Sequence, residues 1–433
     1  MLLLDLLYLS ALGAASPYCA YKLLTQRKIR AGLKEKLGFV RPRTDLRPCV
    51  WFHCVSVGEV GLAREMIRRF EQRFPGIEPV ISTGTDTGRS AAEKSFPNHT
   101  IFYYPFDFGP SVRRTLRAIS PRAIVLMELE LWPNLILAAR RRGVPVMIVN
   151  GRITEKNFRS LSRVRRLVAP LLNSLHTIAV QDDDYASRIL ALGADPDKVA
   201  ITGNMKYDTV KLSIPADHPA YAAMKAVQAS TMLAGGCTWA GEEDILLRIY
   251  ADLRQSHPGL RLVLAPKHAE RLPEVRSLIE RAGFVPAGLS SLKMHPPNDE
   301  NNRIPANGVI LVDTFGELDA VYAAADIVFV GRSLTQHGGQ NMLEPAALGK
   351  PVIFGPNTEN FREAVELLLA ARAAFRVNSE TELHQCIAEF IGNPEPFRRA
   401  GADGRKAIET KKGTTEKNLG LLERIMKTMN DEC

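Results

Sequence analysis

Residues 331–347, GRSLTQHGGQNMLEPAA, combine glycines with polar side chains that could hold a ligand. They follow the apolar run 326–330 and lead through Gly338 and Gly339 into a helix-like segment, whose early turns carry Asn341 and Glu344. A strand, a glycine turn and a helix N-terminus present free backbone N–H groups to an anion, and a nearby carboxylate can accept hydrogen bonds from sugar hydroxyls. The pattern predicts a sugar-nucleotide site, with an ordinary glycine turn as the alternative.

Carboxylates follow two apolar runs earlier in the chain. Glu59 comes after the run 50–57, at the start of a predicted helix, and Glu128 ends the run 123–128 with Glu130 two residues later. A carboxylate whose pKa is raised by burial can remove the proton of an acceptor hydroxyl, and we interpret Glu59 as such a general base. An acid that only stabilises the helix dipole is the alternative. Two carboxylates at one strand end are costly unless they are used, which favours a functional role for Glu128.

Further polar residues lie at other predicted strand ends. The candidates for binding an acceptor sugar or phosphate are Ser56, Gly58, Thr83, Thr85 and Arg152. Turn formation and helix capping are the alternative for the two threonines. In the second half of the chain, Lys267 and His268 are candidate cationic contacts for a leaving phosphate. Gly316 and Glu317 open a helix there and present free N–H groups.

The sequence indicates chemistry without a metal or a bound cofactor. No D-x-D pair stands out at a strand end as a magnesium site, and none of the six cysteines forms a C-x-x-C pair or a Cys/His cluster. We predict that Cys49 and Cys54 are buried as small apolar residues, in keeping with a reducing compartment.

Short apolar runs alternate with helical stretches through most of the chain. The predicted strands are 50–57, 79–84, 100–104, 123–128, 144–150, 177–181 and 199–202, then 232–235, 260–265, 284–287, 309–312, 326–330, 351–354 and 374–377. Runs that are apolar throughout are typical of parallel sheets covered on both faces. The prolines at 215 and 219 interrupt the pattern. We therefore predict an α/β fold of two Rossmann-like domains in series, whose strand carboxyl ends face a central cleft.

Length and composition agree with two domains and an anionic partner. A chain of 433 residues exceeds one ordinary core, and 24% charged with 45% hydrophobic residues is typical of a folded protein. The formal net charge of +9 suits acidic lipid or a phosphorylated substrate. Only three tryptophans leave little material for stacking bases, so we predict no nucleic-acid partner.

The first 24 residues are mostly apolar and are followed by a basic stretch with charges at 27, 28, 30, 34, 36, 41 and 43. About 20 apolar residues can span a bilayer, and basic flanks stay on the cytoplasmic side. A cleaved signal peptide carries its charges before the apolar run. We predict an uncleaved anchor in the inner membrane with the catalytic domains on its cytoplasmic side. An interfacial amphipathic helix is the alternative. The basic stretch and the arginines at 163, 165 and 166 would face the anionic membrane surface. The arginines at 140–142 also belong to this basic set, but for them an ordinary solvated helix face is the preferred alternative.

An ordered set of motifs resembles one family. The motifs are SVGE (56–59), TGTxTG (83–88), PxD (105–107), ExExWPN (128–134), NGR (150–152), TGNMKYD (202–208), GGCTxxGEE (235–243), PKHxER (266–271), DTFGEL (313–318) and GGQNxxEP (338–345). Their order is similar to that in the 3-deoxy-D-manno-octulosonic acid (Kdo) transferases of lipopolysaccharide synthesis. The resemblance runs from the N-terminal segment to about residue 365.

The resemblance implies a GT-B fold with a C-terminal helix that crosses back to the first domain. It implies CMP-Kdo as donor, a lipid A precursor (lipid IVA-type) as acceptor, and inverting, metal-independent transfer. The family's catalytic base matches Glu59, and its second important acid matches Glu128. The donor side then includes Gly338, Gly339, Asn341, Glu344, Lys267 and the Gly316–Glu317 turn.

The chain departs from the family's usual pattern at four places on the donor side. The common G-S-T-H reads Gly236-Cys237-Thr238-Trp239, and the usual Arg of P-R-H is Lys267. The common G-G-S-L contains Arg332 as its second residue, and the His before Asn341 is Gln340. These departures concern the detailed donor contacts.

The predicted organisation is an anchor at 1–26, an acceptor-binding domain at 27–210, a donor-binding domain at 219–390 and C-terminal helices at 391–433. Two other functions stay open at this point. One is a different GT-B enzyme, a UDP-sugar transferase or epimerase, and the other is a non-catalytic membrane protein that binds a sugar nucleotide.

Overall fold

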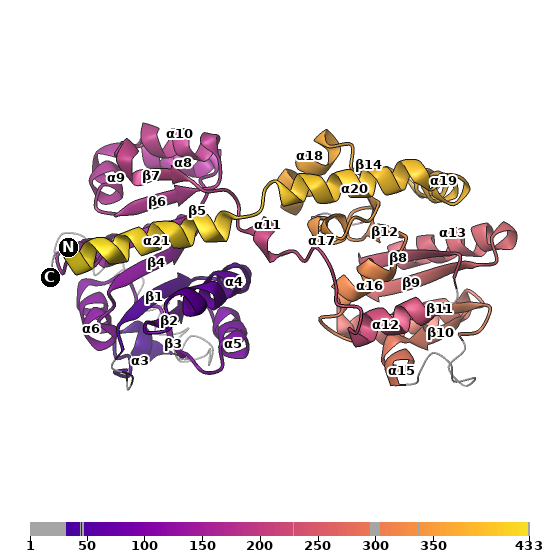
Figure 1. The fold of residues 1–433 in the computed structure, drawn as a ribbon, viewed down its shortest axis with the longest axis horizontal. Helices are drawn as coiled ribbons and strands as arrows, with labels where there is room; N and C mark the ends of the chain where they lie inside the picture. Colours follow the sequence, from indigo (N-terminus) through magenta and orange to yellow (C-terminus); the bar gives the residue numbers. More distant parts are fainter. Residues whose placement is uncertain are drawn as a thin grey trace, which may run out of the picture. The chain divides into compact units, whose positions relative to one another are not determined.

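The computed structural model describes residues 32–43, 45, 47–227, 229–294, 304–335 and 338–431. The chain divides into two compact units, each built on one seven-stranded sheet. The first unit runs to Thr209 and includes the segment from Lys412 onward, and the second is Val210–Lys411 (Figure 1). The predicted anchor lies outside the described residues. No helix of the described part is long and apolar enough to cross a bilayer.

The first unit contains an all-parallel sheet with strand order β3-β2-β1-β4-β5-β6-β7, which extends the order of dinucleotide-binding folds. Its strands are β1 Cys49–Cys54, β2 Glu78–Thr83, β3 Thr100–Tyr103, β4 Ala123–Met127, β5 Val146–Gly151, β6 Thr177–Val180 and β7 Val199–Ile201. Every residue of the central strands β1 and β4 is buried, because helices cover both faces of the sheet. This explains why the runs lack polar alternation.

The helices of the first unit are α3 Leu33–Lys36, α4 Val57–Arg73, α5 Asp86–Ser95, α6 Gly109–Ile119, α7 Pro133–Arg140, α8 Glu155–Ser162, α9 Arg165–Leu172, α10 Asp183–Ala191, α11 Lys206–Thr209 and α21 Thr414–Asp431. Met66 and Phe70 on the buried face of α4 pack in the same core as Leu419 and Leu422 of α21. Figure 1 shows α21 in yellow beside the elements of this unit. The last helix therefore completes the core that the N-terminal half begins.

The second unit repeats the architecture with strand order β10-β11-β9-β8-β12-β13-β14, again all parallel. Its strands are β8 Thr231–Thr238, β9 Leu260–Pro266, β10 Val285–Gly288, β11 Gly308–Leu311, β12 Ile327–Val330, β13 Val352–Phe354 and β14 Ala374–Arg376. Its helices are α12 Pro219–Ala226, α13 Glu242–Ser256, α14 Leu272–Arg281, α15 Leu289–Met294, α16 Leu318–Ala324, α17 Leu343–Ala347, α18 Arg362–Ala370, α19 Glu380–Gly392 and α20 Glu395–Glu409.

The prediction of two Rossmann-like α/β domains is confirmed, and each predicted apolar run contains a strand. The structure places the end of the first unit at Thr209, one residue before the predicted boundary at residue 210. It divides the predicted C-terminal segment 391–433, because α20 belongs to the second unit and α21 to the first.

Candidate functional site

Glu59 lies in the first turn of α4, directly beyond the carboxyl end of β1. Ser56 caps the helix, and its Oγ accepts from the Glu59 N–H at 3.4 Å. In return, Glu59 Oε1 accepts from the Ser56 hydroxyl at 2.9 Å and Oε2 accepts from the Val55 N–H at 2.8 Å. Glu59 thus also has the position of an acid that stabilises the helix dipole, which was the structural alternative for this residue. A carboxylate has about four acceptor positions, so these two bonds leave it capacity to accept a proton.

Three carboxyl groups interact at this end of the sheet. Burial raises the pKa of Glu59, and the charge of Glu128 raises it further. Burial raises the pKa of Glu130 from 4.5 to about 7, and the charges of Glu59 and Glu128 add to that effect. The structure thus brings the two predicted catalytic residues together, with Glu130 as a third member. Acids whose pKa lies close to neutral are suited to proton transfer at physiological pH.

Glu128 has an unusual backbone conformation. Its φ is +58°, in the left-handed region, and Asn150 at the end of the neighbouring strand β5 has a φ of +56°. Residues other than glycine rarely adopt this backbone conformation, and those that do cluster at functional sites. Glu128 Oε2 accepts from Arg152 Nε at 3.1 Å. Arg152, predicted to contact an acceptor phosphate, therefore pairs with Glu128 while half of its side chain reaches solvent.

The other predicted acceptor residues surround the ends of β1 and β2. Thr85 caps α5, because its Oγ1 accepts from the Gly88 N–H at 3.0 Å, so the capping alternative is realised there. Thr83 ends β2 and is buried, and its hydroxyl has no partner among the described residues. Gly58 is exposed, and a Cβ placed on it would meet only Ser56 Oγ, at 3.8 Å.

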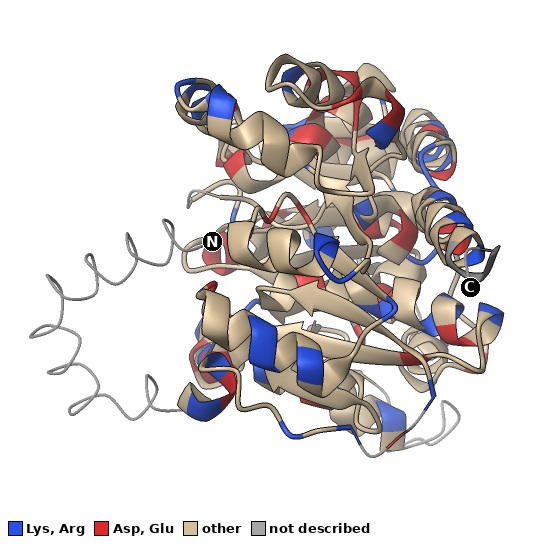
Figure 2. Cartoon of the chain, turned by 90° about the vertical axis from the view of Figure 1, so that its left-hand side faces the viewer, with Lys and Arg blue, Asp and Glu red and all other residues tan. Residues whose placement is uncertain are grey.

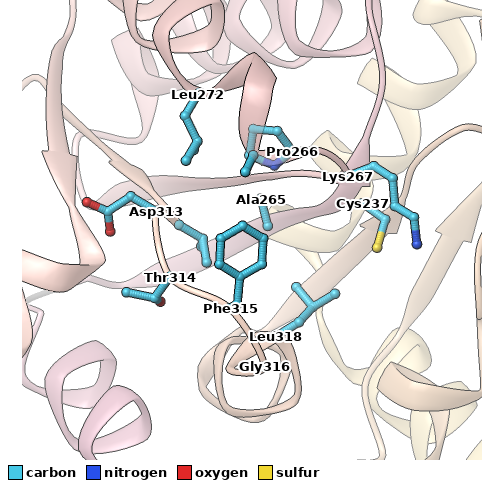
Figure 3. Close-up of a pocket in the computed structure, with 12 residues that line it drawn as sticks. Cys237, Ala265, Pro266, Lys267, Leu272, Asp313, Thr314, Phe315, Gly316 and Leu318 are labelled. Carbon is cyan, nitrogen blue, oxygen red and sulfur yellow. The ribbon is translucent and has the colours of Figure 1, made fainter. Parts of the chain in front are cut away.

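The second unit contains a cavity of about 250 Å³ at the carboxyl ends of β8 and β9 and after β11. Its walls include Cys237, Pro266, Lys267, Asp313, Phe315 and Gly316. Figure 3 shows the Phe315 ring in the middle of this group and Lys267 beside Cys237. Phe315 is 74% exposed, which is unusual for an aromatic ring. We had not singled out this residue, although an exposed Phe inside the DTFGEL motif could have indicated a binding surface.

The other donor-site residues predicted at the ends of β9 and β11 are His268, Gly316 and Glu317. Gly316 has a φ of +75°, a conformation that favours glycine. Glu317 caps α16 and forms an ion pair with Lys293, with Oε1 and Nζ 2.7 Å apart. The His268 ring contacts Trp239 edge-on, with centroids 5.1 Å apart.

The glycine turn at 338–339 differs from the predicted strand–turn–helix. Gly338 and Gly339 both have positive φ, but α17 begins only at Leu343 and has five residues. The Asn341 Oδ1 accepts from the Leu343 N–H at 3.2 Å, so this asparagine sets the helix start. The Gly338 N–H donates to the Glu359 carboxylate at 2.8 Å and the Gly339 N–H to a backbone carbonyl at 2.9 Å. The expectation of free N–H groups on these glycines is therefore wrong.

Glu344 is held in a fixed orientation beside the glycine turn. Asn341 Nδ2 donates to its Oε1 at 3.0 Å, which orients the group. Burial raises the pKa of Glu344 to about 7, with the charge of Asp319 adding to the effect. A carboxyl group that is partly protonated at neutral pH can donate to a sugar hydroxyl as well as accept from it.

Two buried carboxylates each hold the backbone near predicted site residues, one in each unit. Neither is among the residues predicted for the site. Glu242 accepts from the N–H groups of Trp239, Arg332, Ser333 and Leu334, at 2.9, 2.7, 3.0 and 3.0 Å. In the first unit, Asp107 accepts from the first N–H groups of α7. Both lie in motifs of the ordered set. Sequence alone did not distinguish their positioning role from direct ligand contact.

In the part of the chain that the structure describes, no group of three or more His, Cys, Asp or Glu residues could hold a metal ion. Cys49 and Cys54 are free and buried, as predicted. Burial raises the pKa of the Cys49 thiol to about 12, so this sulfur is inert at neutral pH.

Glu130 should make stability depend on pH. Its pKa is raised in the folded state, so its stabilising contribution is complete below pH 4.5 and is lost as pH rises through about 7. In Glu130→Gln, we expect the fall in the free energy of unfolding between about pH 5 and about pH 7.5 to shrink by about 1 kcal/mol, a figure discounted for partial exposure. Urea unfolding at both pH values measures this difference. An identical fall in both proteins would show that Glu130 has an ordinary pKa.

Two Rossmann-like units in series, each with polar groups gathered at its strand carboxyl ends, are the architecture of the GT-B fold class. Residues 31–209 match the family model described as 3-deoxy-D-manno-octulosonic-acid transferase (kdotransferase). The 3-deoxy-D-manno-octulosonic acid transferase of Haemophilus influenzae is 30% identical over 410 residues, 91% of each chain. The chain therefore belongs to the Kdo transferase family, as the motifs indicated, and is a glycosyltransferase.

A second relative and one solved structure are also similar to this chain, the first in sequence and the second in fold. The Bordetella pertussis 3-deoxy-D-manno-octulosonic acid transferase is 30% identical over 394 residues, which cover 88% of this chain and 89% of the relative. A solved structure of UDP-GlcNAc 2-epimerase from Neisseria meningitidis, bound to UDP-GlcNAc, covers 84% of this chain and 99% of its own, with a TM-score of 0.55 and 18% identity. At that identity the likeness is one of fold alone.

Proposed function

We propose that this protein transfers Kdo from CMP-Kdo to a lipid A precursor of the lipid IVA type in lipopolysaccharide synthesis, with Glu59 as the general base. The observation that carries the proposal is the buried carboxyl of Glu59 at the end of β1, whose pKa is raised, in a chain of the Kdo transferase family. A carboxylate whose pKa is raised is a stronger base toward a hydroxyl proton than an ordinary one.

The reaction is an inverting displacement. The acceptor hydroxyl oxygen attacks the anomeric carbon of Kdo while Glu59 takes its proton. The bond from that carbon to the phosphate oxygen breaks, and CMP leaves with the electron pair. The charge of Glu128 raises the pKa of Glu59 and so makes it a stronger base, and Glu128 also holds Arg152 by a hydrogen bond. The acceptor contacts Ser56, Gly58, Thr83, Thr85 and Arg152.

The donor binds in the second unit. Lys267 at the wall of the 250 Å³ cavity offsets the charge of the leaving phosphate. His268, Gly316 and Glu317 flank the nucleotide, while Asn341 and Glu344 bind the sugar beside the turn that Gly338 and Gly339 form. We propose that this transfer needs neither a metal nor a resident cofactor, and full activity after treatment with a chelator is the expected result.

Membrane contact is part of the proposal, in addition to the anchor predicted at 1–26. Residues 162–167 at the α8–α9 junction are all exposed, with Leu167 76% and Val164 46% accessible beside three arginines, Arg163, Arg165 and Arg166. Figure 2 shows basic residues on several helices of the face that it presents. Apolar tips among arginines are typical of surfaces that dock on anionic lipid.

Binding to anionic vesicles should depend on this junction and on salt. In high salt we expect the full chain to bind more weakly but to stay bound, and the chain without residues 1–24 to be released. In the chain without residues 1–24, Leu167→Ser should weaken flotation with vesicles of acidic phospholipid by about tenfold. Leu190→Ser, at a 37% exposed position on α10, is the control. Equal flotation of the two variants would exclude the junction, and full release of the intact chain by salt alone would exclude the anchor.

The decisive experiment is incubation of the protein with CMP-Kdo and a tetraacylated lipid A precursor, followed by mass analysis of the glycolipid. Addition of Kdo to the lipid is the expected result. A parallel thermal-protection assay with CMP and UDP separates this function from that of a UDP-sugar enzyme. Protection by UDP but not by CMP would contradict the proposal. Ligand protection without product would indicate a non-catalytic binding protein.

A further inference from the structure

We infer that Arg332 is a specificity residue for the donor, whose guanidinium binds the carboxylate of the transferred sugar. The inference rests on the proposed function, because Kdo differs from neutral sugars in carrying a carboxylate on the carbon whose bond breaks. The donor therefore presents two anionic groups side by side, that carboxylate and the phosphate. Lys267 accounts for only one of them.

The backbone of Arg332 is held in a conformation that arginine rarely adopts. Its φ is +53°, in the left-handed region, where a Cβ is crowded. The conformation is maintained because Glu242, which is fully buried, accepts from the Arg332 N–H at 2.7 Å and from the next two N–H groups. Strain of this kind persists only where the surroundings enforce it, and it clusters at ligand sites.

The same carboxylate also fixes the surface on which the arginine side chain rests. Glu242 Oε2 accepts from the Trp239 N–H at 2.9 Å. The guanidinium carbon of Arg332 lies 5.4 Å from the centroid of the Trp239 ring, a cation–π contact. Because one buried side chain sets both loops, the position of the guanidinium is determined before any ligand arrives.

The guanidinium has charge available for a ligand. Among the described residues, no carboxylate forms an ion pair with the Arg332 side chain. The other side chain that contacts the Trp239 ring is His268, which is not an acid. Its planar fork suits a carboxylate, which it can bind through two parallel hydrogen bonds. Lys267 is a compact charge, better suited to a phosphate oxygen. Its N–H donates to the Thr238 carbonyl at 3.1 Å, which places it next to the same turn.

Three departures from the usual family pattern thus meet at one place. Trp239, Lys267 and Arg332 are far apart in the sequence, yet the structure gathers them around the β8–α13 turn. Lys267 at the end of β9 and Arg332 on the loop after β12 therefore present two different cations near one turn, a compact ammonium and a planar guanidinium.

The test is Arg332→Gly, because glycine suits a positive φ and this substitution removes the side chain without disturbing the loop. Arg372→Gly is the matched control, since Arg372 is an exposed arginine with a φ of +52° in the same unit. For Arg332→Gly we expect KM for CMP-Kdo to rise about thirtyfold, the loss typical of a charged hydrogen bond, and the inhibition constant of CMP to stay within about twofold. For Arg372→Gly, both should stay unchanged.

Each possible result of this test leads to a different conclusion. An unchanged KM for CMP-Kdo in Arg332→Gly, with product still formed, would overturn the inference and leave the proposed function intact. Equal losses for CMP and CMP-Kdo would place the arginine on the phosphate and refute the carboxylate assignment. If the unaltered protein makes no Kdo-lipid, the proposed function itself has failed. A melting temperature no lower than that of the parent confirms that the fold is retained.

Discussion

Glu59→Gln should lower kcat by a factor of about 10² to 10⁴, the range attributed to a general base, while KM for the donor changes little. The substituted amide has the same shape, and its oxygen can still accept from the Val55 N–H that Glu59 now binds. The helix start should therefore survive. What the amide lacks is the ability to take the proton of the acceptor hydroxyl. Steady-state rates with both substrates, together with a donor-binding measurement, check the expectation.

A matched control lies two turns along the same helix. Glu65 pairs with Arg68 and Arg69 on the outer surface of α4, so Glu65→Gln should leave kcat unchanged. In the unaltered enzyme, the rate should fall as pH falls through the raised pKa of Glu59, because only the ionised form accepts a proton. If Glu59→Gln keeps a tenth or more of the wild-type kcat, the substitution raises the activation free energy by roughly 1.4 kcal/mol at most. The base must then be another group.

The strands could be predicted because burial on both faces of a parallel sheet leaves a simple signal. β4, with the sequence AIVLM, is buried at every position and reads as an apolar run. The run predicted at 50–57 was too long, since β1 ends at Cys54 and Ser56 already caps α4. Apolarity locates a strand well, whereas its end depends on where a cap begins the next helix.

The proximity of Glu59 and Glu128 also follows from topology. β1 and β4 are hydrogen-bonded neighbours, so residues beyond their carboxyl ends must lie at the same edge. The glycine turn could not be predicted as well. The partner of the Gly338 N–H is Glu359, 21 residues away, and nothing local in the sequence indicates that contact. Local pattern therefore identified the candidate residues but could not show which backbone groups are already satisfied.

The same limit explains why Glu242 was missed as a positioning residue. Its partners at 332–334 lie 90 to 92 positions further along the chain, on the loop that follows the neighbouring strand β12. The motif indicated that a carboxylate mattered there, but only the fold shows that it joins two loops. A side chain with four backbone partners should have a large effect on stability.

Glu242→Ala should lower the free energy of unfolding of the second unit by about 3 to 5 kcal/mol, because several backbone N–H groups lose their acceptor in a buried place. Amide hydrogen exchange should quicken at residues 332–334 and at Trp239, the groups that Glu242 now holds. KM for CMP-Kdo should rise with it, since the Arg332 loop loses its support. Glu270→Ala, an exposed position after β9, is the control for a substitution that should leave stability unchanged. A loss below about 1 kcal/mol with unchanged exchange would mean that the two loops hold their geometry without this carboxylate, and that the strain at Arg332 has another source.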